Sequence, residues 1–196
     1  MNPNPARCRD PADGGPPPPE PPSSIAVLPY DPEWPARYAA VAAELSTALG
    51  DTVTRLEHIG STAVPGLAAK DLIDVLAGVT SWEAAGGVAV PVLQALGFEC
   101  YWRSDEPPGH LQFVRRDGTG QRIVHVHLAP EGEPVWERVR FRDYLRAHPE
   151  EAAGYAAVKR DMAHRYPDDR ASYTRGKAGY VARVMALASL EQEQGS

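Results

Sequence analysis

Two stretches decide the fold of this chain: Glu57-His58-Ile59-Gly60-Ser61 and Leu72-Ile73-Asp74-Val75. Both belong to short apolar runs that are typical of β-strands. Gly60 and Ser61 directly follow the first run. Glycine lets a backbone approach a phosphate closely, and the Ser61 hydroxyl could bind that phosphate. Asp74 lies inside the second run, where a metal ion could bridge its carboxylate to a phosphate. The two stretches therefore predict a phosphate site, although a Gly-Ser pair with a spaced Asp also arises by chance in loops.

The order of elements around these stretches predicts an α+β fold. Short apolar or alternating segments predict strands over 25–28, 53–59, 72–79, 98–103, 111–115 and 123–128. A helix is expected to begin at Asp31 and end at Gly50, and a second helix, entered near Pro91, to end at Gly97. After Pro134 the pattern is helical in three segments. Strands that come first and helices that come last are typical of the α+β class.

Composition predicts one domain with two tails. The first 24 residues are rich in proline and almost lack apolar residues, so we expect a disordered tail over 1–24. A single domain is expected over 25–190, and a flexible tail over 191–196. No apolar run approaches the roughly 18 residues of a membrane helix, and residues 1–24 lack a hydrophobic signal region. A cytoplasmic protein without a membrane partner is expected.

The charge is distributed unevenly along the chain. The net charge is −6, yet residues 134–196 carry eleven Lys or Arg against nine Asp or Glu. A mildly acidic protein with a locally basic helical half suits a small anionic ligand better than a nucleic acid. The alternative is that these basic residues only form solvated helix faces.

Several separate blocks resemble the GrpB family of small bacterial proteins. The first is the run His58-Ile-Gly-Ser-Thr-Ala-Val-Pro-Gly-Leu-Ala-Ala-Lys70, and the resemblance continues through 125–128, 141–146 and 173–177. It covers about Ile25 to the last helix. This resemblance implies a nucleotidyltransferase-like fold, with a mixed β-sheet and a C-terminal helical region. In that fold Ser61 and Asp74 would lie in the catalytic site. A domain of the family also occurs attached to dephospho-coenzyme A kinase in some bacteria.

The sequence departs from that fold at Leu76. Side chains alternate between the two faces of a strand, so Asp74 points away from Ile73 and Val75. Nucleotidyl transfer with two metal ions needs a second carboxylate two residues after Asp74, on the same face, and Leu76 stands there. The missing carboxylate argues against ordinary nucleotidyltransferase chemistry.

His125 and His127 are candidate metal ligands. They share one face of the expected strand over 123–128, about 6–7 Å apart. Neutral imidazoles bind divalent transition metals well, so Asp74, His125 and His127 could form a site with two histidines and one carboxylate. The expected cofactor is a divalent metal ion, Mg, Mn or Zn. The alternative is a pair of histidines that hydrogen-bond on a half-buried sheet or contact a phosphate as cations.

Four residues beyond Gly60 and Ser61 are candidate ligand-binding residues: Lys70, Arg142, Tyr173 and Lys177. The lysines could reach a phosphate as point charges, and Arg142 could bind phosphate or carboxylate through two nitrogens. Tyr173 precedes Lys177 by one helical turn, so a base against Tyr173 with its phosphates on Lys177 is sterically sensible. The alternatives are an ordinary surface Lys70 and a surface ion-pair network around Arg142.

Three hypotheses about function remain. The first is a protein that binds a nucleotide or phosphorylated small molecule and supports metal-dependent nucleotidyl or phosphoryl transfer. The second is a non-catalytic accessory or sensor module, linked to coenzyme A metabolism, that contacts a protein partner. The third is a metal-dependent hydrolase built on Asp74 and the two histidines. The sequence has no Walker A loop, no dinucleotide-binding glycine motif and no GxSxG motif, which argues against those classes of enzyme.

Overall fold

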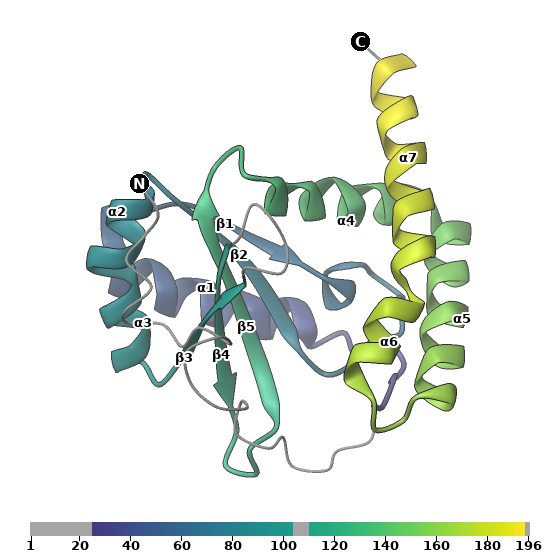
Figure 1. The fold of residues 1–196 in the computed structure, drawn as a ribbon, viewed down its shortest axis with the longest axis horizontal. Helices are drawn as coiled ribbons and strands as arrows, with labels where there is room; N and C mark the ends of the chain where they lie inside the picture. Colours follow the sequence, from purple (N-terminus) through teal and green to yellow (C-terminus); the bar gives the residue numbers. More distant parts are fainter. Residues whose placement is uncertain (1–24, 104–109, 195–196) are drawn as a thin grey trace. The chain divides into compact units, whose positions relative to one another are not determined.

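The computed structural model describes residues 25–103 and 110–194, so the tail expected over 1–24 lies outside the described residues. Figure 1 shows the order of the elements along this part of the chain. They are α1 (Trp34–Leu49), β1 (Val53–Ile59), β2 (Ile73–Val79), α2 (Trp82–Ala84), α3 (Val90–Ala95), β3 (Glu99–Arg103), β4 (His110–Arg116), β5 (Arg122–Pro130), α4 (Glu137–Ala147), α5 (Pro149–Arg165), α6 (Arg170–Gly176) and α7 (Ala178–Gln194).

The described residues form two compact units, a finer division than the single domain that the sequence predicts. The first unit contains residues 33–58, 72–103 and 110–136. The second contains residues 25–32, 59–71 and 137–194. The first unit carries the β-sheet, and the second carries the helices from α4 onward.

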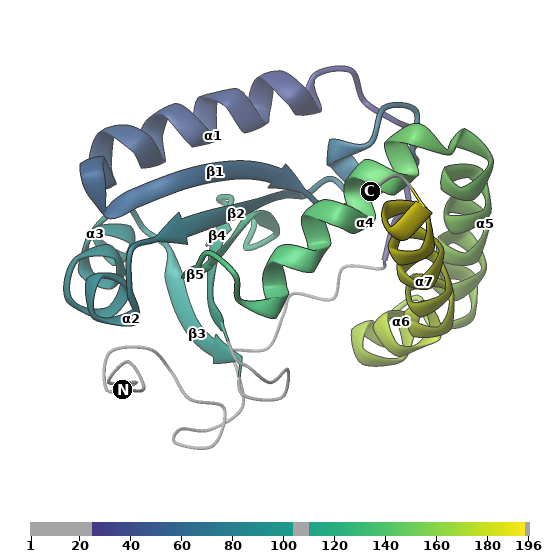
Figure 2. The ribbon, with the colours of Figure 1, turned by 90° about the horizontal axis from the view of Figure 1, so that it is seen from above.

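A five-stranded mixed sheet forms the first unit, in the order β1-β2-β5-β4-β3. Strand β2 pairs with β5 in parallel, whereas β5 pairs with β4 and β4 with β3 in antiparallel fashion. Helix α1 runs along one face of this sheet (Figure 2). It buries Trp34, Val41, Leu45 and Leu49, the stripe with helical spacing that marks it in the sequence. The α+β class is confirmed.

Two expected elements near the start of the chain differ. Residues 25–28 do not form a regular strand, because only Leu28 makes a β-bridge, with Ala69. Helix α1 begins at Trp34, and its N-cap residue is Glu33, with no side-chain capping bond. Asp31 therefore does not cap the helix. The proline in the first turn of α1 is Pro35, which follows the Asp31-Pro32-Glu33 motif and stands where a missing N–H costs nothing.

The helical segment before β3 begins earlier than expected. It starts at Trp82, where Ser81 caps it by accepting a hydrogen bond from the backbone N–H of Ala84. A π-helical turn over Ala85–Ala89 then leads into α3, which carries Pro91 in its first turn. The proline thus marks a change of helix type inside the segment and not its start.

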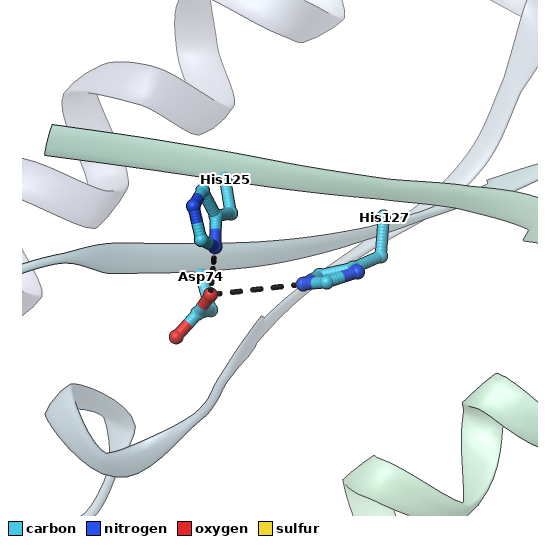
Figure 3. Close-up of side chains that lie close together, drawn as sticks. All are labelled: Asp74, His125 and His127. Atoms are coloured by element: carbon cyan, nitrogen blue, oxygen red, sulfur yellow. Dashed lines mark hydrogen bonds and ion pairs between the residues drawn. The ribbon is translucent and has the colours of Figure 1, made fainter. Parts of the chain in front are cut away.

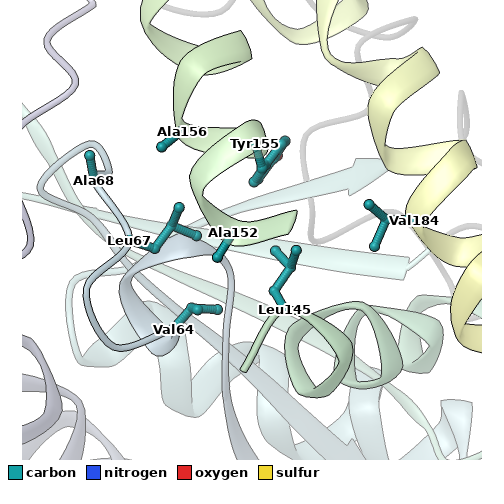
Figure 4. Close-up of a cluster of buried hydrophobic side chains, with 8 residues drawn as sticks. All are labelled: Val64, Leu67, Ala68, Leu145, Ala152, Tyr155, Ala156 and Val184. Carbon is teal, nitrogen blue, oxygen red and sulfur yellow. The ribbon is translucent and has the colours of Figure 1, made fainter. Parts of the chain in front are cut away.

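The helices of the second unit pack around one hydrophobic cluster (Figure 4). Its buried members are Val64, Leu67, Ala68, Leu145, Ala152, Tyr155, Ala156 and Val184. The loop over 61–69 thus contributes to the same core as α4, α5 and α7. The last expected helical segment is divided into α6 and α7, and α7 includes residues 191–194, which the sequence assigned to a tail.

Candidate functional site

Three side chains meet on the sheet of the first unit: Asp74, His125 and His127. Asp74 on β2 is the Cα partner of His125 on β5, and His127 is two residues further along β5. One oxygen of Asp74 lies 3.2 Å from Nδ1 of His125 and 3.6 Å from Nε2 of His127. Both rings point toward this oxygen (Figure 3). Side-chain alternation and strand register together bring the predicted trio into contact.

Leu76 lies beside this cluster and is fully buried. It is the Cα partner of His127, in the place where a second carboxylate would share the face of Asp74. The structure therefore supplies one carboxylate and two imidazoles there, with a leucine instead of a further acid.

The electrostatics of the cluster keep Asp74 ionised. Burial alone would raise the pKa of the Asp74 carboxyl, but hydrogen bonds and charge from His125 and His127 outweigh this effect. The pKa of Asp74 consequently lies well below its usual value. A carboxylate at neutral pH is the form that binds a cation.

The trio fits a transition metal ion better than magnesium. One ligand atom from each residue lies within 4.8 Å of the others. Bonds of about 2.0–2.1 Å at the tetrahedral angle separate neighbouring ligand atoms by about 3.3 Å. The distances of 3.2 and 3.6 Å from Asp74 are close to that separation. Two imidazoles and one carboxylate suit Zn, Mn, Fe or Ni, whereas Mg prefers oxygen ligands.

Sequence reasoning missed two neighbours of this cluster, His110 and Gln112 on β4. Nε2 of His110 lies 2.9 Å from Nδ1 of His127, and Nε2 of Gln112 lies 3.4 Å from Nδ1 of His125. His110 is buried. The signal in the sequence was the alternation His110-Leu111-Gln112, which puts both polar side chains on one face of β4.

Gly60 and Ser61 belong to the second unit and form a tight turn after β1. Gly60 has a φ of 73°, a left-handed conformation that glycine adopts without strain. A single 3₁₀ turn over Ser61–Ala63 follows, in which the N–H of Ala63 donates to the carbonyl of Gly60. The turn explains why glycine stands at position 60. Phosphate binding by the pair stays a prediction.

Lys70, Tyr173 and Lys177 do come together in the second unit. The ammonium groups of Lys70 and Lys177 lie 5.1 and 4.3 Å from the centre of the Tyr173 ring. The Tyr173 side chain is buried, and burial raises its pKa to about 12. A buried ring flanked by two cations is better suited to hold those cations in place than to stack on a base.

Lys159 on α5 joins this group, and sequence reasoning did not single it out. Its side chain is buried and donates a hydrogen bond to the carbonyl of Ala68. Burial, together with the positive charges of Lys177, Arg160 and Lys70, lowers the pKa of Lys159 to about 7. Lys159 is buried because α5 packs against the loop over 61–69, and no local sequence pattern predicts this packing.

Arg142 is buried on α4 and already engages a carboxylate. Its Nε and Nη2 atoms donate to the two oxygens of Asp143 at 2.8 and 3.1 Å. This geometry matches the ion-pair alternative that the sequence left open. A ligand would have to compete with Asp143 for the guanidinium group.

Among residues 25–103 and 110–194, no helix is long and apolar enough to span a membrane.

The comparison with protein families gives one match across both units: the model for "GrpB protein" matches residues 24–187. Among curated proteins, the UPF0157 protein PA4798 of Pseudomonas aeruginosa is 42% identical over 167 residues. That match covers 84% of this chain and 67% of the relative.

Solved structures agree with this match. The crystal structure of the conserved protein GrpB from Enterococcus faecalis has a TM-score of 0.74 at 28% identity, covering 85% of this chain and 99% of that one. The structure of the GLD-2/RNP-8 complex has a TM-score of 0.52 at 15% identity, covering 81% of this chain and 60% of that one. GLD-2 has a nucleotidyltransferase fold, so this second likeness identifies the fold and nothing more.

A further relative carries the name of an enzyme. The dephospho-CoA kinase of Mycolicibacterium paratuberculosis is 32% identical over 172 residues. The match covers 76% of this chain but only 42% of the kinase. This chain therefore resembles less than half of that protein.

Proposed function

Because the chain belongs to the GrpB family and has a nucleotidyltransferase-like fold, we propose that it binds a nucleotide or another phosphorylated small molecule together with a divalent metal ion. The reaction that such binding supports is nucleotidyl or phosphoryl transfer. The observation that carries this proposal is the meeting of Asp74, His125 and His127 on adjacent strands. Fold alone does not set function, so the proposal rests on these three residues.

The metal part of the proposal follows from the ligand atoms. Asp74 would bind through its carboxylate, His125 through Nδ1 and His127 through Nε2, since these are the atoms that face one another. A bound divalent ion would offset the negative charge of phosphate oxygens. The donor set favours Zn or Mn over Mg.

The phosphate part follows from the lysines of the second unit. The sequence has 20 Lys and Arg residues, of which only three are lysines, at positions 70, 159 and 177. Lys70 and Lys177 contact one tyrosine ring, and both raise the positive potential at Lys159. An ammonium group is a compact charge that suits phosphate oxygens, so this lysine cluster (Lys70, Lys159 and Lys177) is the phosphate-binding group that we propose.

Ser61 and Arg142 have lesser parts in this proposal. Gly60 and Ser61 would contribute backbone and hydroxyl contacts, as the sequence pattern predicts. Arg142 would bind the ligand only if its guanidinium group released the carboxylate of Asp143.

The first test is metal content in protein purified without a histidine tag. We expect about one equivalent of metal after incubation with Zn or Mn, and none in a His125→Ala/His127→Ala double variant with an unchanged circular dichroism spectrum. Wild-type protein that stays metal-free after this incubation would contradict the proposal.

The second test separates binding from turnover. Nucleoside triphosphates should raise the melting temperature of the metal-loaded protein more than that of the metal-free protein, because a ligand of the native state stabilises it. Phosphorus NMR then identifies the reaction. Nucleotidyl transfer releases pyrophosphate, whereas transfer of the terminal phosphoryl group releases a nucleoside diphosphate.

A non-catalytic accessory module is the second candidate, and two observations favour it. Leu76 takes the place of a catalytic carboxylate, and the relative named dephospho-CoA kinase matches this chain over less than half of its own length. Metal-dependent nucleotide binding without release of either phosphate product, across a panel of acceptors, would favour this candidate over a transferase.

A further inference from the structure

Lys159 is the most deeply buried member of the lysine cluster in the second unit. Its side chain is 2% exposed and donates a hydrogen bond to the carbonyl of Ala68, and its Nζ atom lies 4.8 Å from the centre of the Tyr155 ring. Lys70 and Lys177 are half-buried. In the part of the chain that the structure describes, no carboxylate pairs with Lys159. Burial without a counter-ion disfavours the charged form of an amine, so Lys159 holds its proton weakly.

The charges that act on Lys159 from the described residues are positive. They belong to Lys177 after α6, Arg160 beside it on α5 and Lys70 before β2. Burial is the larger cause and these charges are the smaller one, and together they lower the pKa of Lys159 to about 7. Tyr173, which Lys70 and Lys177 flank, stays uncharged because burial raises its pKa to about 12. The charge of Lys159 therefore depends on what binds beside Lys70 and Lys177.

An anion bound by Lys70 and Lys177 would change the balance at Lys159. Its negative charge offsets the two positive charges that disfavour an ammonium group there. At about 8–12 Å and an effective dielectric constant of about 20, one negative charge raises the pKa of an amine by about 1–1.5 units. Protonation of Lys159 in turn raises the affinity for the anion by the same factor, because the coupling between two bound species is reciprocal.

We propose that the lysine cluster takes up one proton at Lys159 when it binds a doubly charged tetrahedral oxyanion, such as the terminal phosphate of a phosphorylated small molecule. The proton comes from the solvent and forms an ammonium group on Nζ, so no further reactant is needed. The affinity for the anion consequently falls as the pH rises through neutrality. This inference rests on the phosphate part of the proposed function and needs no metal ion.

The first experiment follows the charge of Lys159 in metal-free wild-type protein. The chain has only three lysines, so labelling lysine with ¹³C at Cε gives three NMR signals, and the signal lost in Lys159→Met belongs to Lys159. Inorganic sulfate is the probe, because it is a dianion of constant charge near neutral pH, whereas a phosphate monoester titrates near about pH 6. We expect saturating sulfate to raise the titration midpoint of Lys159 from about pH 7 by at least about one unit. Sodium chloride at the same ionic strength is the control.

The second experiment measures sulfate affinity against pH in wild type and two variants. Wild type should bind sulfate about tenfold more tightly at about pH 6 than at about pH 9, the factor that a shift of one unit requires. Lys159→Met has no charge to gain, so its affinity should be nearly constant and should match that of wild type at the higher pH. Arg165→Gln removes an exposed cation of the same helix, α5, and should keep the pH dependence of wild type.

The outcomes separate this inference from the proposed function. Sulfate that shifts the signals of Lys70 and Lys177 but leaves the midpoint of Lys159 unchanged would overturn the proton uptake and keep the phosphate site. A Lys159 that is already charged at about pH 9 without sulfate would also overturn it, since its pKa would then be near the ordinary value of an amine. Sulfate without effect on all three signals would contradict the phosphate part of the proposed function together with this inference. If Lys159→Met does not fold, Lys70→Arg and Lys177→Arg assign the other two signals, and the titration of wild type still decides.

Discussion

Asp74 and His125 are 51 positions apart in the sequence, yet they are direct Cα partners across the parallel pair β2 and β5, and their side chains meet at 3.2 Å. A shift of this register by one residue would turn one of the two side chains to the opposite face. The apolar residues that alternate with them, including Val75 and Val126, are fully buried and fix the register. Core packing therefore holds the candidate metal ligands together.

Asp74→Asn tests the carboxylate at the centre of the cluster. The amide is neutral and is a weaker ligand than a carboxylate. The variant should therefore bind Zn or Mn at least about 100-fold more weakly than wild type. This loss should exceed that from removing only a hydrogen-bond partner of a ligand. Isothermal titration calorimetry gives the affinity, and circular dichroism checks the fold. Glu83→Gln makes the same chemical change on an exposed residue and should have no effect. Unchanged affinity in Asp74→Asn would remove Asp74 from the site.

Leu76→Asp tests whether the missing carboxylate limits metal choice. Leu76 is fully buried, so both Leu76→Asp and its uncharged counterpart Leu76→Asn should lose about 2–5 kcal/mol of stability in metal-free protein. Mg or Mn should then restore stability to the Asp variant alone, by about 2.7 kcal/mol when the ion is at 100 times its dissociation constant. Denaturant unfolding with and without metal measures this. An equal change in unfolding free energy on addition of metal to the two variants would show that position 76 does not face the ion.

The strands β2 and β5 and the meeting of Asp74, His125 and His127 were predictable because both depend on alternation. Apolar residues at every second position locate β2 and β5, and the same alternation places His125 and His127 on one face. Asp74 joins them because the two buried strands are neighbours in this fold. The sequence alone could thus bring these three side chains together, whereas their binding of a metal ion stays a prediction.

His110 and Lys159 could not be predicted in the same way. The hydrogen bond of His110 to His127 depends on the antiparallel register of β4 with β5, which becomes known only when the strands are paired. Lys159 is buried because α5 packs on the loop over 61–69, a contact between segments 91 positions apart. The start of α1 was also misplaced, since an Asp-Pro-Glu motif is as compatible with a turn before a helix as with a cap.

The buried lysine predicts a pH-dependent stability. In the folded protein the pKa of Lys159 is lowered to about 7, whereas in the unfolded chain it is near its ordinary value of 10.5. Between these values the unfolded chain binds more protons, so stability rises with pH through this window and is lowest below about pH 7. The contribution is at most about 1.4 kcal/mol per pH unit. Urea unfolding between about pH 6.5 and 9 measures it.

Lys159→Met is the variant that tests this assignment. It keeps most of the buried side chain but removes the charge. The stability of wild type relative to the variant should therefore rise with pH between about 7 and 10.5. Titration of Lys70, Lys177 and Arg160 is common to both proteins and largely cancels in that difference. Loss of the bond to the Ala68 carbonyl shifts the variant by a constant amount. Parallel stability curves for the two proteins would contradict a lowered pKa of Lys159.

Substitution by alanine should lower the stability of the protein at Gly154 in α5 but not at Gly179 in α7. Alanine is favoured over glycine in a helix by about 0.5–1 kcal/mol. Nothing lies within 4 Å of a Cβ added at Gly179, so Gly179→Ala should be neutral or stabilising. A Cβ at Gly154 would collide with the hydroxyl of Tyr180, which donates a hydrogen bond to the Glu151 carboxylate at 2.6 Å. Gly154→Ala should therefore destabilise the protein.

Tyr180→Phe tests whether the Tyr180 hydroxyl is the cause of that loss of stability. It removes the hydroxyl that the new methyl group would meet, so Gly154→Ala should cost less in Tyr180→Phe than in wild type, although Tyr180→Phe alone loses the bond to Glu151. A double-mutant cycle on unfolding free energies isolates this coupling, which for residues in direct contact is commonly about 0.5–3 kcal/mol. Additive effects of the two substitutions would show that Tyr180 moves aside without cost, and that the packing of α7 on α5 at this position is loose.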